Sequence, residues 1–373
     1  MRTLFWLAVF GCAYSYALYP LLLRLVPARP PVRGSPAFMP PVSLIIACRN
    51  EGRRLRHKLD NALELDYPDI EIIVCSDASD DDSDAIVAEY ALRGVKLVRS
   101  DERRGKEFAQ GLAIAASRGE ILVFSDAGTD LPAGSIRVLV EDLSDPSVGA
   151  VSSEDRFVSA DGSVVGEGAY VKYEMWLRRL ESARAGLVGL SGSFFAIRRS
   201  ILGGWDAGIP SDFACALYAV RAGTRAISDP RMVGIYRDIK DPGKEYARKI
   251  RTAVRGMTAM ARLREVLNPF RYGWFSFQVW GHKLMRWLVP WCMLLLLVCS
   301  AWLAPQSRFF AIALGVQLLG YVLVTLCHWV PVLQRFVLLR LGYFFVQVNL
   351  ALAAAGIAFL RGRRIVTWEP SAR

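Results

Sequence analysis

The sequence has few of the residues that build metal centres, disulfide frameworks or dinucleotide sites. Its seven cysteines include no Cys-x-x-Cys pair, and its three histidines are far apart along the chain. This pattern argues against a zinc site and a disulfide framework, and it favours a reducing compartment. No Gly-x-Gly-x-x-Gly motif follows the first expected strand, which disfavours a dinucleotide-binding domain. Although the net charge is +11, the basic residues match no nucleic-acid motif, so we expect no nucleic-acid partner.

Apolar residues are abundant but unevenly placed. They make up 53% of the chain, and the mean hydropathy is +0.27. Residues 3–26 form one long apolar stretch, and residues 284–360 hold most of the rest. The part between them has the length of a single globular domain. The sequence therefore predicts an N-terminal membrane anchor (1–33), a cytoplasmic globular domain (34–266), and an interfacial helix with C-terminal transmembrane helices and a short basic tail (267–373).

The flanking charges predict the orientation in the membrane. Residues 3–26 are long enough to span a bilayer and exceed the usual apolar region of a cleaved signal peptide, which is the alternative. Arg24, Arg29 and Arg33 follow this stretch, so the positive-inside rule places the globular domain in the cytoplasm, on a multi-pass protein of the inner membrane. The basic residues favour anionic lipid and phosphorylated substrates as partners.

The C-terminal region leaves the number of spans open. Residues 270–287 mix Trp and Phe with basic residues, which favours a helix in the membrane interface over the start of a spanning helix. Residues 288–303, 309–330 and 336–360 are spanning candidates. Three spans would put the basic tail at residues 361–364 outside, against the charge rule. Either one segment is interfacial or the rule fails here.

The globular block alternates short apolar runs with helical patterns. Strands are expected at 42–47, 70–75, 95–98, 121–124 and 148–152, and helices at 55–63, 83–92, 107–116 and 136–143. Continuous apolar strands that alternate with helices predict an α/β fold with a mostly parallel sheet covered on both faces.

Polar loops follow three of the expected strands. They carry Arg49-Asn50-Glu51, an acidic run that begins at Asp77, and Asp126-Ala127-Gly128. Because the carboxyl ends of parallel strands share one edge of a sheet, and ligands bind there in open α/β sheets, we expect the three loops to converge on one site. A single acidic loop would be weak evidence, since acidic turn residues are common.

Together these motifs resemble the family 2 inverting glycosyltransferases with a GT-A fold, in their membrane-bound bacterial form. The resemblance covers nearly the whole chain. The segments that carry it are 41–51 (PVSLIIACRNE), 76–83 (SDASDDDS), 103–107 (RRGKE), 125–128 (SDAG), 189–198 (GLSGSFFAIR), 211–213 (SDF), 248–256 (RKIRTAVRG), 267–269 (LNP) and 282–287 (HKLMRW).

The resemblance implies a metal carboxylate and a separate catalytic base. Asp126 matches the first Asp of the family's DxD motif, which handles the diphosphate of the donor and its Mg²⁺ or Mn²⁺. Asp212 matches the residue that takes the proton from the acceptor hydroxyl. A hard oxygen ligand suits such an ion, which neutralises charge on the departing diphosphate. Direct displacement at one carbon then inverts the anomeric centre.

The resemblance also implies a UDP-sugar donor and a glycan or lipid-linked acceptor. The implied donor contacts are Glu51 and Asp77 at the uridine, Lys106 at the nucleotide, and Arg251 and Arg255 at the diphosphate. Gly192 and Ser193 fall where the acceptor is held. The implied activity is hexosyl transfer in the synthesis of cell-surface polysaccharide.

Each assignment has a structural alternative. Asp126 could be a turn residue, Asp77 part of a solvated turn, and Gly192 a turn glycine. Asp212 could be the N-cap of a helix that begins at Phe213, and Glu51 could cap the helix that follows it. Lys106 could be a surface charge. Arg251 and Arg255 share one helix face that could be solvated or could face lipid.

The sequence departs from the family pattern at three positions. Gly128 stands at the third position of the DxD motif, with Asp130 nearby, and Ser211 replaces the acidic residue before the base. Thr252 stands where processive synthases carry the Trp of their Gln-x-x-Arg-Trp motif. Transfer of one sugar to a lipid-linked acceptor is therefore an alternative to polymer synthesis. A catalytically silent scaffold or export partner with the same fold is the alternative to an enzyme.

Overall fold

The computed structural model describes residues 1–30, 37–158, 169–237 and 242–365. The chain forms two compact units. The sheet unit comprises residues 26–240, 258–278 and 365–373, and the helical unit comprises residues 1–25, 241–257 and 279–364. The expected domain limits at residues 33 and 266 stay a prediction, and residues 241–257 group with the apolar helices. Arg33 lies outside the described residues.

The sheet unit is built on seven strands in the order β3-β2-β1-β4-β6-β5-β7. Strands β1 to β4 run parallel, β5 is parallel to β7, and β6 lies antiparallel between β4 and β5. The strands are β1 (Val42–Cys48), β2 (Ile70–Asp77), β3 (Val95–Ser100), β4 (Ile121–Asp126), β5 (Val148–Val158), β6 (Phe194–Arg198) and β7 (Arg225–Arg237). The mostly parallel sheet and its first five strands are confirmed. Strands β6 and β7 were not predicted.

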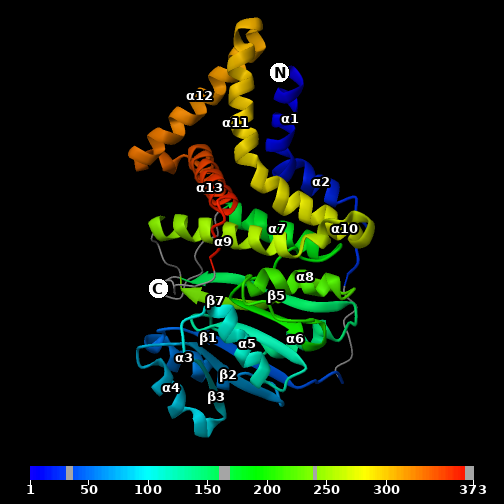
Figure 1. Cartoon of the computed structure of the whole chain (residues 1–373), viewed down its shortest axis with the longest axis vertical. Coiled ribbons are helices and arrows are strands. Elements are labelled where there is room, and N and C mark those ends of the chain that lie inside the picture. Colours follow the sequence, from blue (N-terminus) through cyan, green and yellow to red (C-terminus); the bar gives the residue numbers. More distant parts are fainter. Residues whose placement is uncertain (31–36, 159–168, 238–241, 366–373) are drawn as a thin grey trace. The chain divides into compact units, whose positions relative to one another are not determined.

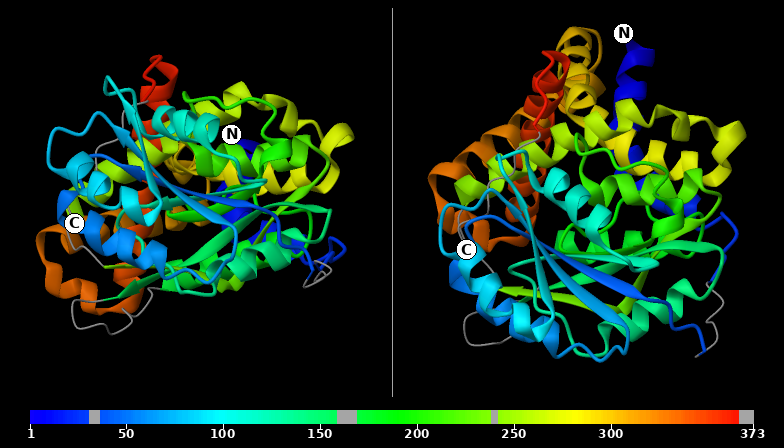
Figure 2. Two further views of the ribbon diagram at one scale, coloured as in Figure 1. Left: turned by 90° about the horizontal axis from the view of Figure 1, so that it is seen from below. Right: turned by 60° about the horizontal axis from the view of Figure 1, so that its bottom comes forward.

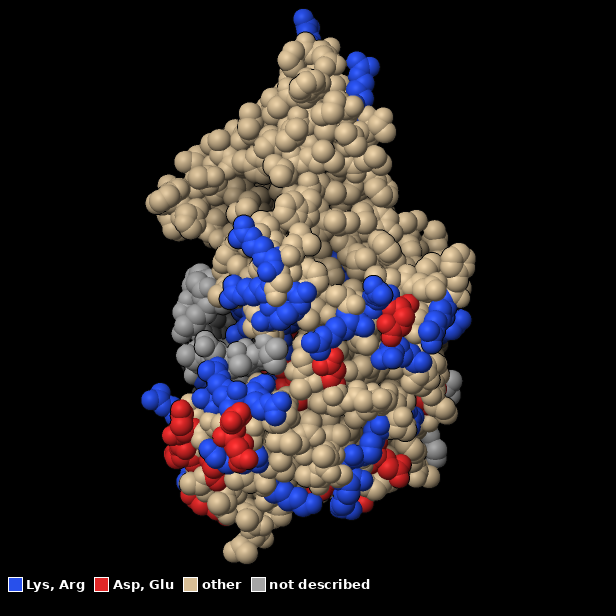
Figure 3. All heavy atoms as spheres, viewed as in Figure 1, with Lys and Arg blue, Asp and Glu red and all other residues tan. Residues whose placement is uncertain are grey.

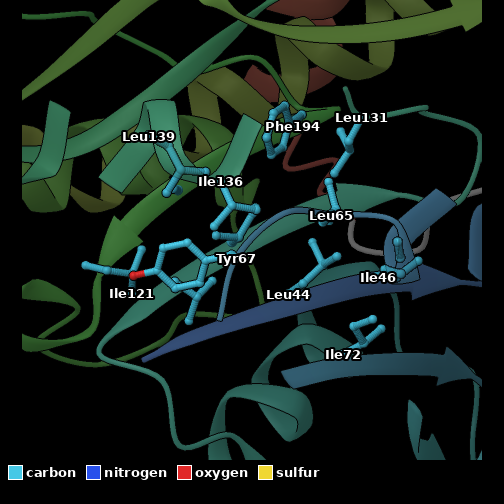
Figure 4. Packing of buried hydrophobic residues seen from close by; sticks show 14 of the residues in the cluster. Leu44, Ile46, Leu65, Tyr67, Ile72, Ile121, Leu131, Ile136, Leu139 and Phe194 are labelled. Atoms are coloured by element: carbon cyan, nitrogen blue, oxygen red, sulfur yellow. The ribbon is translucent and has the colours of Figure 1, made fainter. Parts of the chain in front are cut away.

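Helices cover both faces of this sheet (Figures 1 and 2). Three of them bury apolar side chains in one core with alternate residues of the central strands, as Figure 4 shows for Leu44, Ile136 and Leu139. They are α3 (Gly52–Leu63), α4 (Ser83–Glu89) and α6 (Ser135–Leu143). Because successive strand residues point to opposite faces, Ile45 and Ile73 are buried on the other face. The helices there include α5 (Lys106–Ala116), which lies against β1, β2 and β3.

Two further helices complete this unit. They are α7 (Ala169–Ser182), which contacts β7, and α8 (Ser211–Arg221), which contacts β5, β6 and β7. Three cysteine thiols are enclosed within the unit, those of Cys48 on β1, Cys75 on β2 and Cys215 on α8. Each is a free thiol.

The apolar segments belong to the helical unit, apart from residues 269–278, which group with the sheet unit. The described residues include four helical segments long and apolar enough to cross a membrane. These are Arg2–Leu23, Pro269–Gln306, Arg308–Trp329 and Val337–Leu360. The first joins α1 (Arg2–Ala13) to α2 (Tyr19–Leu23), the second begins with α10 (Pro269–Val279) and continues as α11 (Met285–Leu303), and the last two are α12 and α13. The face drawn in Figure 3 is almost uniformly uncharged over these helices.

Close packing and interhelical hydrogen bonds hold these helices together. Gly11 of α1 lies so close to Cys292 of α11 that a Cβ atom there would come within 2.4 Å of its sulfur. Gln317 of α12 donates to Ser300 of α11 at 2.7 Å. Small residues and interhelical hydrogen bonds of this kind are how helices associate in lipid. The location of residues 270–287 in the interface stays a prediction.

Candidate active site

The carboxyl edge of the parallel strands brings Asp126 and Lys106 together. Asp126 is the last residue of β4, and Lys106 is the first residue of α5. The Lys106 Nζ atom lies 2.5 Å from Asp126 Oδ1 and 3.2 Å from the carbonyl oxygen of Gly192. Only 10% of the Lys106 side chain is exposed, against 26% for Asp126. Lys106 is therefore a buried, paired cation and not the surface charge of the alternative reading.

The charge state of this lysine follows from its neighbours. Burial alone would lower the pKa of Lys106, but the negative charge of Asp126 and its hydrogen bond outweigh burial and raise it. Asp212 adds to this effect at longer range. The site therefore holds a positive charge that is paired with the Asp126 carboxylate.

Asp212 lies in the first turn of α8. The helix begins at Ser211 with Pro210 as its N-cap, so Asp212 is not the N-cap residue. Its Oδ1 atom accepts from the backbone N–H of Phe213 at 2.8 Å, and its carbonyl oxygen accepts from Leu190 N at 3.1 Å. The carboxylate is thus held at the positive end of a helix, beside the segment that precedes β6.

Gly192 occupies a position where a side chain would collide with Asp212. A Cβ atom built on Gly192 would lie 2.9 Å from Asp212 Oδ2 and 3.5 Å from its Cγ. The next residue, Ser193, accepts from the backbone N–H of Asp126 through its carbonyl oxygen at 2.9 Å. The segment 189–193 therefore joins Asp126, Lys106 and Asp212 in one constellation, which confirms that the loop after β4 reaches the sheet edge.

Asp77 is buried and not solvated. It ends β2, is 2% exposed, and accepts from the backbone N–H groups of Arg104 and Gly105 at 2.8 to 3.1 Å. These bonds fix the loop that delivers Lys106 at the start of α5. Asp77 therefore positions Lys106 through this loop. Its contact with the uridine stays a prediction.

The loops after β1 and β2 are bonded to each other. Arg49 donates to the carbonyl oxygens of Asp77 and Ala78 at 2.6 and 2.5 Å. Asn50 and Ala78 both have positive φ angles, of 52° and 51°. Left-handed backbone at a residue other than glycine costs about 1–3 kcal/mol and gathers at functional sites. Glu51 is the N-cap residue of α3, and its side chain makes no capping bond but lies 3.4 Å from Arg54 Nη1, so its contact with the uridine stays a prediction.

A fully buried lysine lies beneath the Asp126 turn. Lys58 of α3 donates to Ser125 Oγ at 2.8 Å and to the carbonyl oxygen of Thr129 at 2.5 Å. It thereby ties both ends of the turn that contains Asp126. Burial lowers the pKa of Lys58 to about 7, against the raising effect of Asp130 and Asp126. The helical pattern of residues 55–63 gave no sign of this role.

Asp155 is a second site residue that the sequence did not suggest. It lies on β5, and its Oδ1 atom accepts from the hydroxyls of Ser191 and Ser193 at 2.5 and 2.8 Å. Tyr236 of β7 is buried beside them, and burial, followed by the charge of Asp155, raises the pKa of its hydroxyl well above the usual range.

Three further residues that the sequence analysis considered lie on other elements. Arg251 and Arg255 lie on α9 (Pro242–Arg262), within the stretch that belongs to the helical unit, and their role stays a prediction. Asp130, near Gly128, pairs its backbone with Ile235 of β7, and its Oδ1 atom lies 3.0 Å from His57 Nε2. The described residues include no group of three His, Cys, Asp or Glu side chains that could hold a metal ion on their own.

The architecture has a solved counterpart. The chain is similar to the mannosyltransferase PcManGT from Pyrobaculum calidifontis, solved in complex with GDP-Man and Mn²⁺, with a TM-score of 0.75 and 24% identity. The similarity covers 97% of this chain and 99% of that one. The chain therefore has the predicted fold, that of the GT-A glycosyltransferases.

Sequence comparison gives a family match for part of the chain. Residues 43–204 match the model of glycosyl transferase family 2, so the chain carries a family 2 glycosyltransferase domain. A poly-beta-1,6-N-acetyl-D-glucosamine synthase from Staphylococcus epidermidis is 28% identical over 173 residues, which is 44% of this chain and 42% of that protein. A beta-monoglucosyldiacylglycerol synthase from Nostoc is 26% identical over 217 residues, 54% of this chain and 46% of that protein. The match thus spans less than half the length of these relatives.

Proposed function

We propose that the chain is a membrane-bound inverting glycosyltransferase. It moves a sugar from a UDP-sugar to a glycan or lipid-linked acceptor in cell-surface polysaccharide synthesis. The observation that carries the proposal is the constellation at the sheet edge. There Lys106 lies within 3.2 Å of both Asp126 and the Gly192 carbonyl, while Gly192 packs on the carboxylate of Asp212.

Asp212 is the proposed base. Its carboxylate is fixed from two sides, by the first turn of α8 and by the Gly192 backbone. A carboxylate held in this way can take the proton of an acceptor hydroxyl as the hydroxyl oxygen attacks the anomeric carbon. Because attack and departure occur on opposite faces, an α-linked donor gives a β-linked product.

Asp126 is the proposed ligand of a divalent ion, Mg²⁺ or Mn²⁺. Its partly exposed carboxylate supplies a hard oxygen, which fits such an ion, but Gly128 supplies no second carboxylate. The other ligands would then be oxygens of the donor diphosphate and water. When bound, the ion stabilises negative charge on the diphosphate as it leaves. The Mn²⁺ of the similar mannosyltransferase supports this choice.

Lys106 is proposed to place the positive charge of its ammonium group beside the donor diphosphate. Its ammonium is buried, charged and already aimed at Asp126, so it costs little reorganisation when negative charge develops. Glu51 and Asp77 are the proposed uridine contacts, and Gly192 and Ser193 the proposed acceptor contacts. Arg251 and Arg255 are proposed diphosphate contacts on the basis of the family resemblance alone.

The four apolar helical segments support a multi-pass membrane protein. The basic residues that follow the first segment support an orientation with the sheet unit in the cytoplasm, where nucleotide sugars are made. The location in the inner membrane rests on this argument.

The test is release of nucleoside diphosphate by the purified full chain in detergent. A panel of UDP-sugars, with GDP-mannose added because of the mannosyltransferase neighbour, is supplied with Mg²⁺ or Mn²⁺ and with lipid extract as the acceptor source. We expect release with one donor, abolished by a chelator and by Asp212→Asn. Lys96→Met, which alters an exposed lysine of β3, is the control and should behave as wild type. Absence of both nucleotide binding and release would refute the proposal and favour the scaffold alternative.

A further inference from the structure

Asp155 gathers serine hydroxyls beside the proposed site. Three hydroxyls converge on its Oδ1 atom, those of Ser191 at 2.5 Å, Ser193 at 2.8 Å and Ser153 at 3.3 Å. An ionised carboxylate only accepts hydrogen bonds, so all three hydroxyls can point toward it, and bonds to a charged acceptor are the stronger ones. This clustering orients two serines that flank Gly192.

The two serines hold a peptide that touches every proposed catalytic group. Between them, Gly192 accepts from Lys106 through its carbonyl oxygen and lies against the Asp212 carboxylate with its Cα. Ser193 accepts from the backbone N–H of Asp126. Rotation of the Gly192 peptide would therefore change its contacts with Lys106 and Asp212 together.

Neighbouring elements fix the start of this segment, and Asp155 binds the serine side chains at its end, where Lys106 and Asp126 bond the backbone. Arg178 of α7 donates to the Gly189 carbonyl oxygen at 2.9 Å, and Ser152 accepts from Ser191 N at 2.7 Å. Beyond Ser191, the side-chain anchor shared by both serines is the Asp155 carboxylate, with the two hydroxyls also 2.9 Å from each other. Glu154, the residue before Asp155 on β5, points to the other face and pairs with Arg179.

We infer that Asp155 is a positioning residue for sugar transfer, which sets the Gly192 peptide against Asp212 and Lys106 through Ser191 and Ser193. The inference rests on the proposed function, because it assigns Asp155 to the reaction of that site. It concerns the placement of the base relative to the acceptor, so it predicts an effect on turnover and on acceptor use, and none on nucleotide affinity.

The test compares Asp155→Ala, Asp155→Asn and the matched control Glu154→Gln in the full chain. We expect Asp155→Ala to lower kcat by about 10- to 100-fold, since small misplacements of reacting groups cost that much. The KM for the donor should stay at the wild-type value. Asp155→Asn should recover most of the loss, because its Oδ1 atom still accepts from the serine hydroxyls. Glu154→Gln, which weakens only the Arg179 ion pair, should have wild-type kcat.

A double-mutant cycle separates positioning from general destabilisation. If Asp155 acts through the two serines, Asp155→Ala should cost much less in a Ser191→Ala, Ser193→Ala background than in wild type. Additive losses in the cycle, wild-type kcat in Asp155→Ala, or equal losses in Asp155→Ala and Glu154→Gln would overturn the inference. Should Asp155→Ala fail to fold, Ser191→Ala and Ser193→Ala alone must still lower kcat without raising donor KM.

Different results would refute the proposed function and the proposed role of Asp155. A wild-type chain that neither binds nor cleaves any nucleotide sugar refutes the proposed function. A wild-type chain that transfers sugar, with an Asp155→Ala variant that transfers it equally well, refutes only the role of Asp155.

Discussion

Replacing the buried Lys58 with methionine should remove a pH dependence of stability. Lys58 is 0% exposed, and burial lowers its pKa from 10.5 to about 7. The unfolded chain therefore holds a proton that the folded chain releases between these two values. Because the unfolded state then binds more protons, stability rises with pH through this window. The effect is lost as pH falls below about 7, where both states are charged and the folded state bears the cost of the buried ammonium.

The magnitude follows from the pKa. A folded-state pKa near 7 makes Lys58 contribute about 1.6 kcal/mol of added stability between pH 7.0 and 8.5. For a unit of this size that is a rise of about 3–6 °C in Tm. Lys58→Met removes this slope and also leaves Ser125 Oγ and the Thr129 carbonyl without their donor, which costs about 1–3 kcal/mol for each group. The slope, and not the absolute Tm, is therefore the decisive quantity.

The assay is the Tm of the detergent-solubilised full chain, followed by tryptophan fluorescence at pH 7.0, 7.5, 8.0 and 8.5. The wild-type minus variant difference isolates Lys58, since all other titrating groups are shared. Lys96→Met is the matched control, because Lys96 is more than half exposed, and it should keep the wild-type slope. Equal slopes in wild type and Lys58→Met would show that the buried lysine is not the titrating group.

Three further predictions concern the constellation itself. Asp212→Asn should lower kcat by about 100- to 10,000-fold, as expected for loss of a general base, and leave the nucleotide Kd unchanged by calorimetry; substantial turnover in this variant would exclude Asp212 as the base. Gly192→Ala should lower kcat by about 10- to 100-fold with little change in Tm, because the new methyl group would displace the Asp212 carboxylate. A variant as active as wild type would contradict the packing described for Gly192. Lys106→Met should weaken nucleotide binding and lower kcat by about 100- to 1,000-fold, comparable to loss of a preorganised donor at a developing charge, whereas Lys96→Met should do neither.

The sequence predicted the first five strands because each is a continuous apolar run. Strands β1, β2 and β4 are buried on both faces, so their hydrophobicity does not depend on which neighbour they pair with. Strands β2, β1 and β4 are parallel neighbours in the sheet, so the loops that follow them lie at one edge, as expected. This is why the place of Asp126 at the end of β4 could be predicted, while its role stays a prediction.

The residues that the sequence missed owe their roles to pairing between distant segments. Asp155 contacts Ser191 and Ser193 because β6 runs antiparallel between β4 and β5. The local sequence pattern does not predict this position of β6 in the sheet. Lys58 lies on a helix whose other residues read as an ordinary amphipathic face, and its burial depends on the Ser125–Thr129 turn. Charged residues at core positions are informative only once their partners are known.

The three buried thiols can report local unfolding of the sheet unit through their reaction with an alkylating reagent. Cys48 and Cys75 lie on neighbouring strands and Cys215 lies on α8. Burial raises the pKa of Cys48 to about 12 and raises those of the other two well above the usual range. A thiol in that state reacts with an alkylating reagent only after the surrounding structure has come apart, since the thiolate is the reactive form. The alkylation rate of each of these three positions, resolved by mass spectrometry, therefore measures how often the structure around it opens. No engineered label is needed.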